Sequence, residues 1–242
     1  MLKKFINKIR FPNTYSSEVY INYLRKLGMK IGNDVIIYSP NRTIIDEQYP
    51  WMITIGEHVR ITTGVIILTH DFSWSVLKNY NIGNGIGAIL GASGKIKIGN
   101  NVFIGMNSVI LRGSDIGDNV IIGAGSVVSG KCESNSVYAG NPARKISTLD
   151  NFYKKRERNQ LKEAIELVQT YYKRFNKIPP KDILFEYFML FEKYDNLSEK
   201  FRSQIKLGNT EKESIQYMKN LKCKFSNYND FISYCLSDSE GR

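Results

Sequence analysis

An aliphatic residue recurs at every sixth position through the middle of the chain. The unbroken row is Ile98, Ile104, Ile110, Ile116, Ile122 and Val128. Four positions after each of these stands a small or compact residue, namely Val102, Ser108, Ser114, Val120, Ser126 and Cys132. A period of six fits neither an α-helix nor the two-residue alternation of a strand. It predicts a chain that turns a corner every six residues, so that three short strands complete one coil and stacked coils form a triangular prism.

The same phase can be followed backwards, which extends the predicted prism to residues 31–147. Ile31 and Ile55 lie 24 residues apart, a multiple of six, whereas 31 residues separate Ile67 from Ile98. The second gap breaks the phase, so residues 71–94 are interpreted as a glycine-rich excursion from the coils. Long excursions from a compact domain tend to be functional. At the other end, Gly140 and Pro142 take the chain off the last coil.

The two flanking regions have helical patterns. Residues 1–30 form a predicted adapter, in which Val19, Tyr20, Leu24 and Leu27 share one helix face. Residues 148–242 form a predicted helical region, where a first helix carries Leu161, Ile165, Val168 and Tyr172 on one face and ends before Pro179 and Pro180. Further helices are predicted at 183–194, at 211–224, where Thr210 and Glu213 suggest a capping box, and at 230–236.

Composition excludes several classes of protein. The chain has 242 residues and a formal charge of +11, but no dense run of Lys and Arg with interleaved aromatics indicates a nucleic-acid surface. We therefore predict no nucleic acid and attribute the charge to a solvated basic surface. An anionic ligand or an acidic lipid surface is the alternative, which leaves a peripheral membrane contact open. No run of about 18 apolar residues predicts a transmembrane segment, and the start of the chain lacks the features of a secretory signal.

The three cysteines are widely spaced and predict neither a disulfide framework nor a zinc motif. A cytoplasmic location follows as the simplest expectation.

The repeat resembles a known family in detail. The segments ITIGEHVRITTGVIILTHD, KIKIGNNVFIGMNSVILRGSDIGDNVIIGAGSVVSG and SVYAGNPARKI, in this order around the excursion, resemble the maltose/galactoside and xenobiotic O-acetyltransferase branch of the hexapeptide-repeat acyltransferases. The resemblance implies a mainly β fold, a left-handed parallel β-helix with an extended loop and an α-helical C-terminal extension. It also implies acetyl-CoA (coenzyme A) as co-substrate and a homotrimer. Residues 148–242 resemble the helical extensions of capsular-polysaccharide O-acetyltransferases.

His70 directly precedes the excursion. The resemblance implies that it is the general base that takes a proton from an acceptor hydroxyl, a task for which an imidazole is suited near neutral pH. Asp71 is a candidate to orient it. His58 lies two prism faces away and is expected to be a solvated corner residue. With only two histidines in the chain, a three-histidine zinc site of the β-helical carbonic anhydrase type cannot form in a symmetric trimer, so we predict no catalytic metal.

The donor site is predicted from the stacking of coils. Gly105 with Met106 and Gly123 with Ala124 are eighteen residues apart, so they lie one above the other. Small residues there would let the pantetheine arm approach the backbone, although tight coil geometry explains the glycines equally well. The resemblance adds three contacts, Ser129, Arg144 and Lys145, of which the last two would meet the nucleotide phosphates.

The acceptor site is predicted from alignment with the family. Glu47 and the adjacent Asp46 are the candidates for hydrogen bonds with sugar hydroxyls. Ser39 and Phe103 fall on positions that shape the same channel, and Trp74 of the excursion is a candidate to stack on a sugar ring.

Three functions remain open at this point. The first is O-acetylation of a carbohydrate, with a surface or capsular polysaccharide or its precursor as acceptor. The second is acetylation of an antibiotic or another small xenobiotic by the same residues. The third is a non-enzymatic trimeric scaffold that presents its helical C-terminus.

Overall fold

A computed structural model describes residues 10–81, 83 and 87–237. The first nine residues of the predicted adapter, residues 82 and 84–86 of the predicted excursion and the last five residues of the helical region lie outside the described residues. The chain divides into two compact units, Met1–Phe152 and Tyr153–Arg242, and each is treated by itself.

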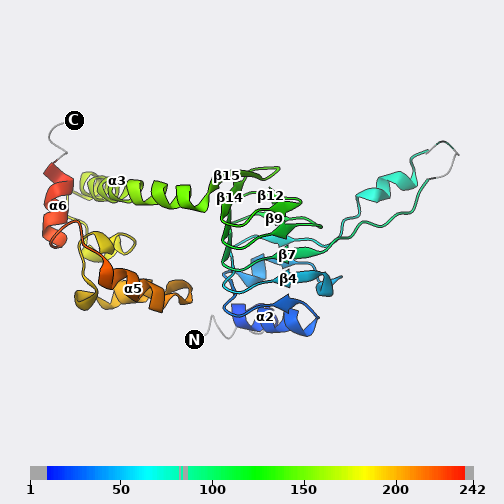
Figure 1. Ribbon diagram of the computed structural model, residues 1–242, viewed down its shortest axis with the longest axis horizontal. Helices are drawn as coiled ribbons and strands as arrows, with labels where there is room; N and C mark the ends of the chain where they lie inside the picture. Colours follow the sequence, from blue (N-terminus) through cyan, green and yellow to red (C-terminus); the bar gives the residue numbers. More distant parts are fainter. Residues whose placement is uncertain (1–9, 82, 84–86, 238–242) are drawn as a thin grey trace. The chain divides into compact units, whose positions relative to one another are not determined.

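The first unit is a stack of coils with three faces, each a sheet of short strands (Figure 1). The first face consists of β1 (Lys30–Ile31), β4 (Ile53–Ile55), β7 (Ile96–Ile98), β10 (Asp115–Ile116) and β13 (Lys131–Cys132). The second face consists of β2 (Ile36–Ile37), β5 (Arg60–Ile61), β8 (Val102–Ile104), β11 (Val120–Ile122), β14 (Ser136–Ala139) and β15 (Arg144–Thr148). The third face consists of β3 (Ile44–Ile45), β6 (Ile66–Ile67), β9 (Val109–Ile110) and β12 (Val127–Val128). All pairings are parallel except that of β14 with β15.

Register between coils follows the predicted repeat. Ile104 pairs with Ile122, and Ile110 pairs with Val128, both one regular coil apart. The residues of both predicted rows, the aliphatic one and the small one, are at most 3% exposed. Three serines of the small row are hydrogen-bonded to main-chain carbonyls: Ser108 and Ser126 to Gly123, and Ser114 to Leu111. Because these hydroxyls satisfy carbonyls at the turns, a small polar residue can replace an aliphatic one inside the prism.

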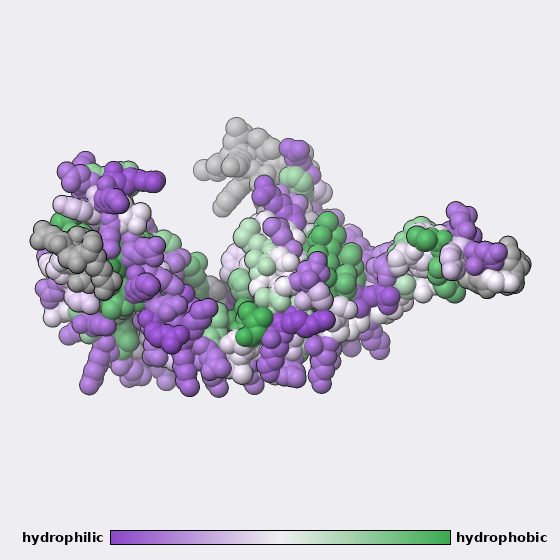
Figure 2. Space-filling view, turned by 90° about the horizontal axis from the view of Figure 1, so that it is seen from above, coloured by the Kyte–Doolittle hydropathy of each residue, from purple (hydrophilic) through white to green (hydrophobic). Residues whose placement is uncertain are grey.

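The excursion is an arm that leaves the prism between β6 and β7 (Figure 1). The outgoing and returning segments of the arm are joined at the root by an isolated antiparallel bridge between His70 and Ser93, and the arm carries the 3₁₀-helix η3 (Ser73–Lys78). Figure 2 shows apolar side chains on its surface. Val76 and Ile89 of the arm are 71% and 81% exposed.

The N-terminal helix α2 (Ser17–Lys26) packs against the prism. Ser16 caps it by accepting a hydrogen bond from the Val19 N–H at 3.3 Å. Its buried residues Tyr20, Ile21 and Leu24 belong to the same apolar cluster as the prism core. Ile21 was not on the face predicted from the sequence.

The second unit has its own core. The helix α3 (Leu149–Phe175), which starts in the first unit, buries Ala164 and Val168 in that core. The other α-helices are α4 (Glu199–Ile205), α5 (Glu211–Asn220) and α6 (Tyr228–Ser237). Stacked aromatic rings fill the centre, with Phe188 4.9 Å from Phe201 and Phe191 5.2 Å from Phe231.

Two predictions for this unit are wrong. Residues 183–194 do not form an α-helix. They are divided among turns and parts of three 3₁₀-helices, η4 (Lys181–Leu184), η5 (Phe188–Leu190) and η6 (Tyr194–Asn196). Phe188 and Leu190 are both buried, although residues two positions apart lie on opposite sides of an α-helix. The helix after Thr210 is present, but Thr210 makes no side-chain cap; its hydroxyl donates to the Leu207 carbonyl at 3.3 Å.

In the described part of the chain, no helix combines the length and the apolar character needed to cross a membrane.

Candidate active site

His70 lies at the root of the arm, where the third face turns toward the first. Its Nδ1 is 2.6 Å from Asp46 Oδ2. Asp46 directly follows β3, and because Ile45 pairs with Ile67 one coil away, the carboxylate lies beneath the segment that ends at His70. The stacking of coils, not closeness in sequence, therefore brings the two residues together.

The carboxylate of Asp46 is buried, and both of its oxygens accept hydrogen bonds. Its side chain is only 4% exposed. Oδ2 accepts from the Thr69 N–H at 3.0 Å and from the Thr69 hydroxyl, and Oδ1 accepts from the Gln48 N–H at 2.9 Å. Burial alone would raise the pKa of Asp46, but the hydrogen bonds that it accepts outweigh burial and hold the pKa below its ordinary value. Asp46 is thus an ionised partner of His70.

This geometry fixes the tautomer of the imidazole. An ionised carboxylate can only accept hydrogen bonds, so Nδ1 of His70 donates and carries the proton. In the neutral ring Nε2 then holds the lone pair. The His70 side chain is 32% exposed, so an outside molecule can reach the ring. The arrangement supplies an oriented proton acceptor, with a hydrogen-bonded carboxylate that stabilises the ring after it takes up a proton.

These contacts correct the assignment of Asp46 to the acceptor site, because its side chain is only 4% exposed and both of its oxygens already accept hydrogen bonds within the chain. Asp71 does not orient His70 either. Its carboxylate is 2.5 Å from Arg112 Nε and accepts from the Ser73 N–H and hydroxyl. The Ser73 and Arg112 hydrogen bonds lower the pKa of Asp71 to about 2. Asp71 therefore ties the arm to the β9 coil.

Two aromatic residues beside His70 were missed by the sequence analysis. The Tyr49 ring is edge-on to the imidazole with centroids 5.6 Å apart, and Trp51 is edge-on to Tyr49 at 5.8 Å. Trp51 is 67% exposed. Both lie at the corner between β3 and β4, around the 3₁₀-helix η2 (Pro50–Met52), so they form an aromatic wall next to the base.

The remaining acceptor candidates lie in different places. Glu47 is exposed, and Tyr23 of α2 donates a hydrogen bond to its carboxylate at 2.8 Å. The Ser39 hydroxyl is 2.7 Å from the Thr63 hydroxyl. Trp74 packs on its own arm, edge-on to Phe72 at 4.8 Å and with Lys78 Nζ 5.0 Å from its ring.

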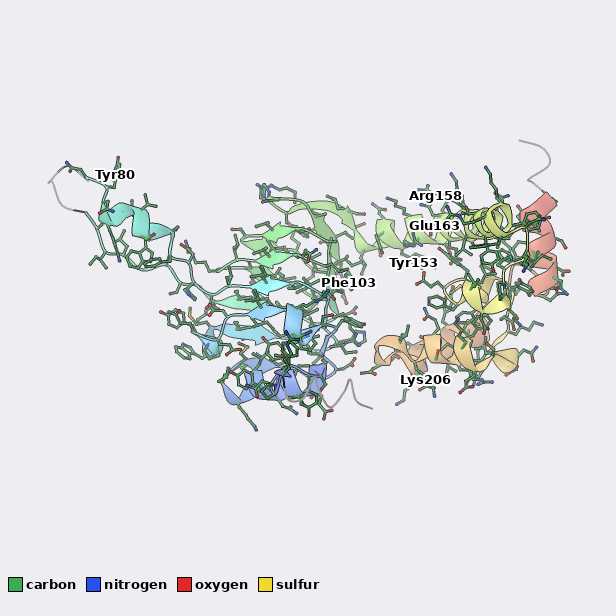
Figure 3. All side chains as sticks on the ribbon, turned by 180° about the vertical axis from the view of Figure 1, so that it is seen from behind. Tyr80, Phe103, Tyr153, Arg158, Glu163 and Lys206 are labelled. Carbon is green, nitrogen blue, oxygen red and sulfur yellow. The ribbon has the colours of Figure 1, made fainter. Side chains whose placement is uncertain are left out.

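Phe103 belongs to the second face and is 43% exposed. In Figure 3 it lies on the side of the prism opposite the arm. Within one chain it is therefore remote from the root of the arm, where His70 lies.

The two glycine pairs of the predicted donor site are also remote from His70 in the chain. Gly105 with Met106 and Gly123 with Ala124 lie where the second face turns into the third, whereas His70 lies where the third face turns into the first. Ser129 lies on the same corner as His70, between β12 and β13. Met106 is 50% exposed, and Ala124 and Ser129 are exposed. A Cβ on Gly105 would lie 2.4 Å from the Ala124 nitrogen, so this glycine is required by the packing of coils. A Cβ on Gly123 would meet the Ala139 Cβ at 3.0 Å.

The two basic candidates lie on β15. Arg144 is exposed and donates to the Ala143 carbonyl at 3.1 Å, while Lys145 Nζ is 2.7 Å from Glu133. The hydrogen bond from Lys145 lowers the pKa of Glu133 and raises that of Lys145. Both contacts are at the surface, where a phosphate could compete for them.

His58 is the second histidine, and it is not simply solvated. It occupies a corner with φ of +56°, as predicted, but its Nδ1 is 2.5 Å from Asp34 Oδ2 and 3.0 Å from Arg60 Nη2. Over the described ranges, no group of three or more His, Cys, Asp or Glu side chains is arranged to hold a metal ion.

Comparison with known proteins agrees with this architecture. The profile of the bacterial transferase hexapeptide, six repeats, matches residues 95–130. Protein CapG of Staphylococcus aureus is 44% identical over 153 residues, which cover 62% of this chain and 81% of that protein. The chain belongs to the hexapeptide-repeat transferase family.

Other proteins similar to this hexapeptide-repeat transferase carry more specific names. Galactoside O-acetyltransferase of Escherichia coli K12 is 37% identical over 113 residues, 46% of this chain and 50% of that protein. A solved structure of a galactoside acetyltransferase in complex with coenzyme A is 27% identical, covers 63% of this chain and 82% of that one, and has a TM-score of 0.43. Family membership confirms the predicted left-handed parallel β-helix with its helical extension, and the predicted enzyme class, an acyltransferase.

Proposed function

We propose that this transferase moves an acetyl group from acetyl-CoA to a hydroxyl of a carbohydrate, with a surface or capsular polysaccharide or its precursor as the acceptor. The observation that carries the proposal is the contact between His70 Nδ1 and the buried carboxylate of Asp46 at 2.6 Å. The galactoside O-acetyltransferase relative supports a carbohydrate acceptor. The resemblance of the helical region to capsular-polysaccharide enzymes supports a polymer.

The residues of the site perform one proton relay. Nε2 of His70 accepts the proton of the acceptor hydroxyl as its oxygen attacks the thioester carbonyl, a contribution worth about 10²–10⁴ in rate. A C–O bond forms and the C–S bond breaks, and the imidazolium returns the proton to the departing sulfur. Asp46 stabilises the charged ring in between. Because the carboxylate is enclosed by the Thr69 and Gln48 N–H groups, it stays in place while the ring changes charge.

The acceptor would lie against the aromatic wall of Tyr49 and Trp51. An exposed indole next to the base offers a face on which a sugar ring can pack. Glu47 lies on the same corner, and its carboxylate oxygens can accept hydrogen bonds from sugar hydroxyls. Trp74, Ser39 and Phe103 stay in the proposal as residues that shape the acceptor site, Phe103 from the opposite side of a neighbouring prism.

The donor would bind along Gly105, Met106, Gly123, Ala124 and Ser129, with Arg144 and Lys145 at the phosphates. The two glycine pairs, Gly105 with Met106 and Gly123 with Ala124, lie on a different corner of the prism from His70, so one chain alone does not bring them to the base. A homotrimer would place the donor corner of one subunit against the base of its neighbour. This separation is the structural support for the trimer. Acetyl-CoA is made inside the cell, which agrees with the predicted cytoplasmic location.

The experiment measures thiol release from acetyl-CoA by the purified protein, with and without a panel of glycans. We expect release only when an acceptor is present, and mass spectrometry should find one acetyl group on the glycan for each thiol. Turnover on small xenobiotics but on no glycan would favour the alternative acceptor class. No heat on calorimetric titration with coenzyme A would leave only the scaffold.

A further inference from the structure

The helical unit contains a lysine-lined hollow that the proposed chemistry does not use. It has a volume of about 610 Å³ and lies between η6 and the segment that joins α5 to α6. Four lysines line it, Lys193, Lys219, Lys222 and Lys224, against a single acidic residue, Asp195. Ligand sites in proteins have volumes of about 300–1,000 Å³. The hollow therefore has the size of a ligand site and the charge of an anion site.

The backbone of the joining segment is fixed to the core of the unit. Cys223 Sγ donates to the Glu192 carbonyl at 3.1 Å, and the Phe225 N–H donates to the Leu190 carbonyl at 3.0 Å. Lys222 and Lys224, on either side of Cys223, are both exposed. Lys222 and Lys224 are thus presented to solvent by a segment whose intervening residue, the half-buried Cys223, is hydrogen-bonded to the rest of the unit.

The four lysines of the hollow outnumber its one acidic lining residue, Asp195. Over the described ranges, none of its four lysines forms an ion pair, whereas Lys181 of the same unit is paired with the Glu192 carboxylate. The chain from Ser214 to Asn229 carries three lysines and no acidic residue. Clustered like charges repel one another, and an anion would relieve that repulsion.

We propose that this hollow binds the carboxylates of an acidic polysaccharide and so holds the polymer whose hydroxyls are acetylated. The proposal rests on the proposed function. Ammonium groups are point charges on flexible stems and suit carboxylates at variable spacing along a polymer, whereas the lining has no arginine fork for a phosphate. Tyr194 is already close to Lys219 Nζ at 5.5 Å and Arg202 Cζ at 5.8 Å, so its ring is a poor platform for a nucleobase.

The test is calorimetric titration of the full chain with polygalacturonate oligosaccharides in the absence of acetyl-CoA. The variant Lys219→Gln/Lys222→Gln/Lys224→Gln removes three charges from the hollow. The matched control Lys155→Gln/Lys173→Gln/Lys177→Gln removes three exposed charges elsewhere in the same unit. With a few-fold loss for each exposed contact, we expect the first variant to bind about tenfold more weakly and the control to bind as the unmodified protein does. Binding should also weaken with added salt.

Equal weakening in the two variants, or no heat with the unmodified protein, would overturn the proposal. Stronger binding of single-stranded DNA or of phosphatidylserine vesicles than of the acidic oligosaccharide would also overturn it, in favour of those ligands. Neutral dextran should give no heat. If the triple variant does not fold, the single charge reversal Lys222→Glu carries the same expectation. Because no donor is present, binding is measured without acetyl transfer, so failure of the hollow is separable from failure of the proposed function.

Discussion

The prism contains two histidine–aspartate pairs that look alike and to which we assign different functions. In each pair the residues are 24 positions apart and the imidazole Nδ1 contacts a carboxylate oxygen, at 2.6 Å for His70 with Asp46 and 2.5 Å for His58 with Asp34. Both histidine side chains are 32% exposed. Distance and exposure alone therefore do not identify the base.

The two pairs differ in the environment of the carboxylate. Asp46 is 4% exposed and its hydrogen bonds other than that to His70 come from uncharged groups, whereas Asp34 is 28% exposed and is also bound by Arg60 Nη2 at 2.8 Å. Arg60 Nη2 is 3.0 Å from His58 Nδ1 as well. Nδ1 cannot donate to Asp34 and accept from Arg60 at once, so this ring has no single tautomer imposed on it. A histidine is therefore oriented as a base by a buried carboxylate that no arginine shares, and closeness to a carboxylate is not sufficient.

The two histidines also differ in the backbone positions that they occupy. His58 stacks in a column of corner residues with positive φ, Asp34, His58, Asn101, Asn119 and Asn135, in which Asn101 donates to Asn119 at 2.9 Å and Asn119 to Asn135 at 2.8 Å. His58 thus takes the place that asparagine has in later coils. His70 lies at the root of the arm and has no counterpart in the repeat.

The largest expected effect is the loss of acetyl-transfer rate when the His70 ring is removed, compared with removal of the His58 ring. His70→Ala should lower kcat by at least about a hundredfold because the proton acceptor is lost. His58→Ala should stay within about threefold of the unmodified protein, as expected for a corner residue remote from the chemistry. Steady-state thiol release measures both. Full activity in His70→Ala, or equal losses in the two variants, would abolish the distinction between the pairs.

The next effect concerns the carboxylates. Asp46→Asn keeps the shape of the side chain but removes the charge that fixes the tautomer, so kcat should fall on the order of tenfold to a hundredfold. Asp34→Asn should leave kcat unchanged. The comparison is made at saturating acceptor, so that a loss in kcat is separated from a change in KM. A purely structural role for Asp46 would be indicated if both variants lose stability but keep the rate.

These pairs also show which features of the fold and of the site can be predicted from the sequence. The six-residue period predicted the prism, its inward residues and the position of the arm, because each inward position is constrained by packing. It did not reveal that Asp46 lies beneath His70, since the coil containing η1 (Pro40–Arg42) and η2 departs from eighteen residues. Because this coil is irregular, alignment with the family assigned Asp46 to the acceptor site instead of to His70.

Local packing determines other features that the sequence does not predict. Trp74 rests against Phe72 and Lys78 of its own arm, and no periodic pattern reports such contacts. In residues 183–194 the aromatic content suggested a helix, whereas the core takes up neighbouring residues from short turns. Tyr49 and Trp51 had a signal in hindsight, because two aromatics at a corner of a prism cannot point into its aliphatic core.

A smaller effect tests the corner role of His58. His58→Ala places alanine at φ of +56° and should lower the free energy of unfolding by about 1 kcal/mol. His58→Asn should keep the stability within about 0.5 kcal/mol, because asparagine tolerates this conformation and occupies the same corner in three later coils. Urea unfolding monitored by circular dichroism measures both. If alanine were tolerated as well as asparagine, the backbone would not explain why a polar residue stands there.

The smallest expected effect is the pH dependence of the stability that the Asp46 carboxylate contributes. The folded-state pKa of Asp46 is lowered, so its ionised form stabilises the fold at pH values above its ordinary pKa of 3.8, and this contribution disappears as the pH falls through the lowered folded-state value. Asp46→Asn should therefore cost stability at pH 7 but cost progressively less below pH of about 4, so the two unfolding curves converge in acid. Urea midpoints between neutral and acid pH measure the convergence. A constant difference across this range would mean that Asp46 stabilises the fold through its shape alone, and its charge would then no longer account for the orientation of His70.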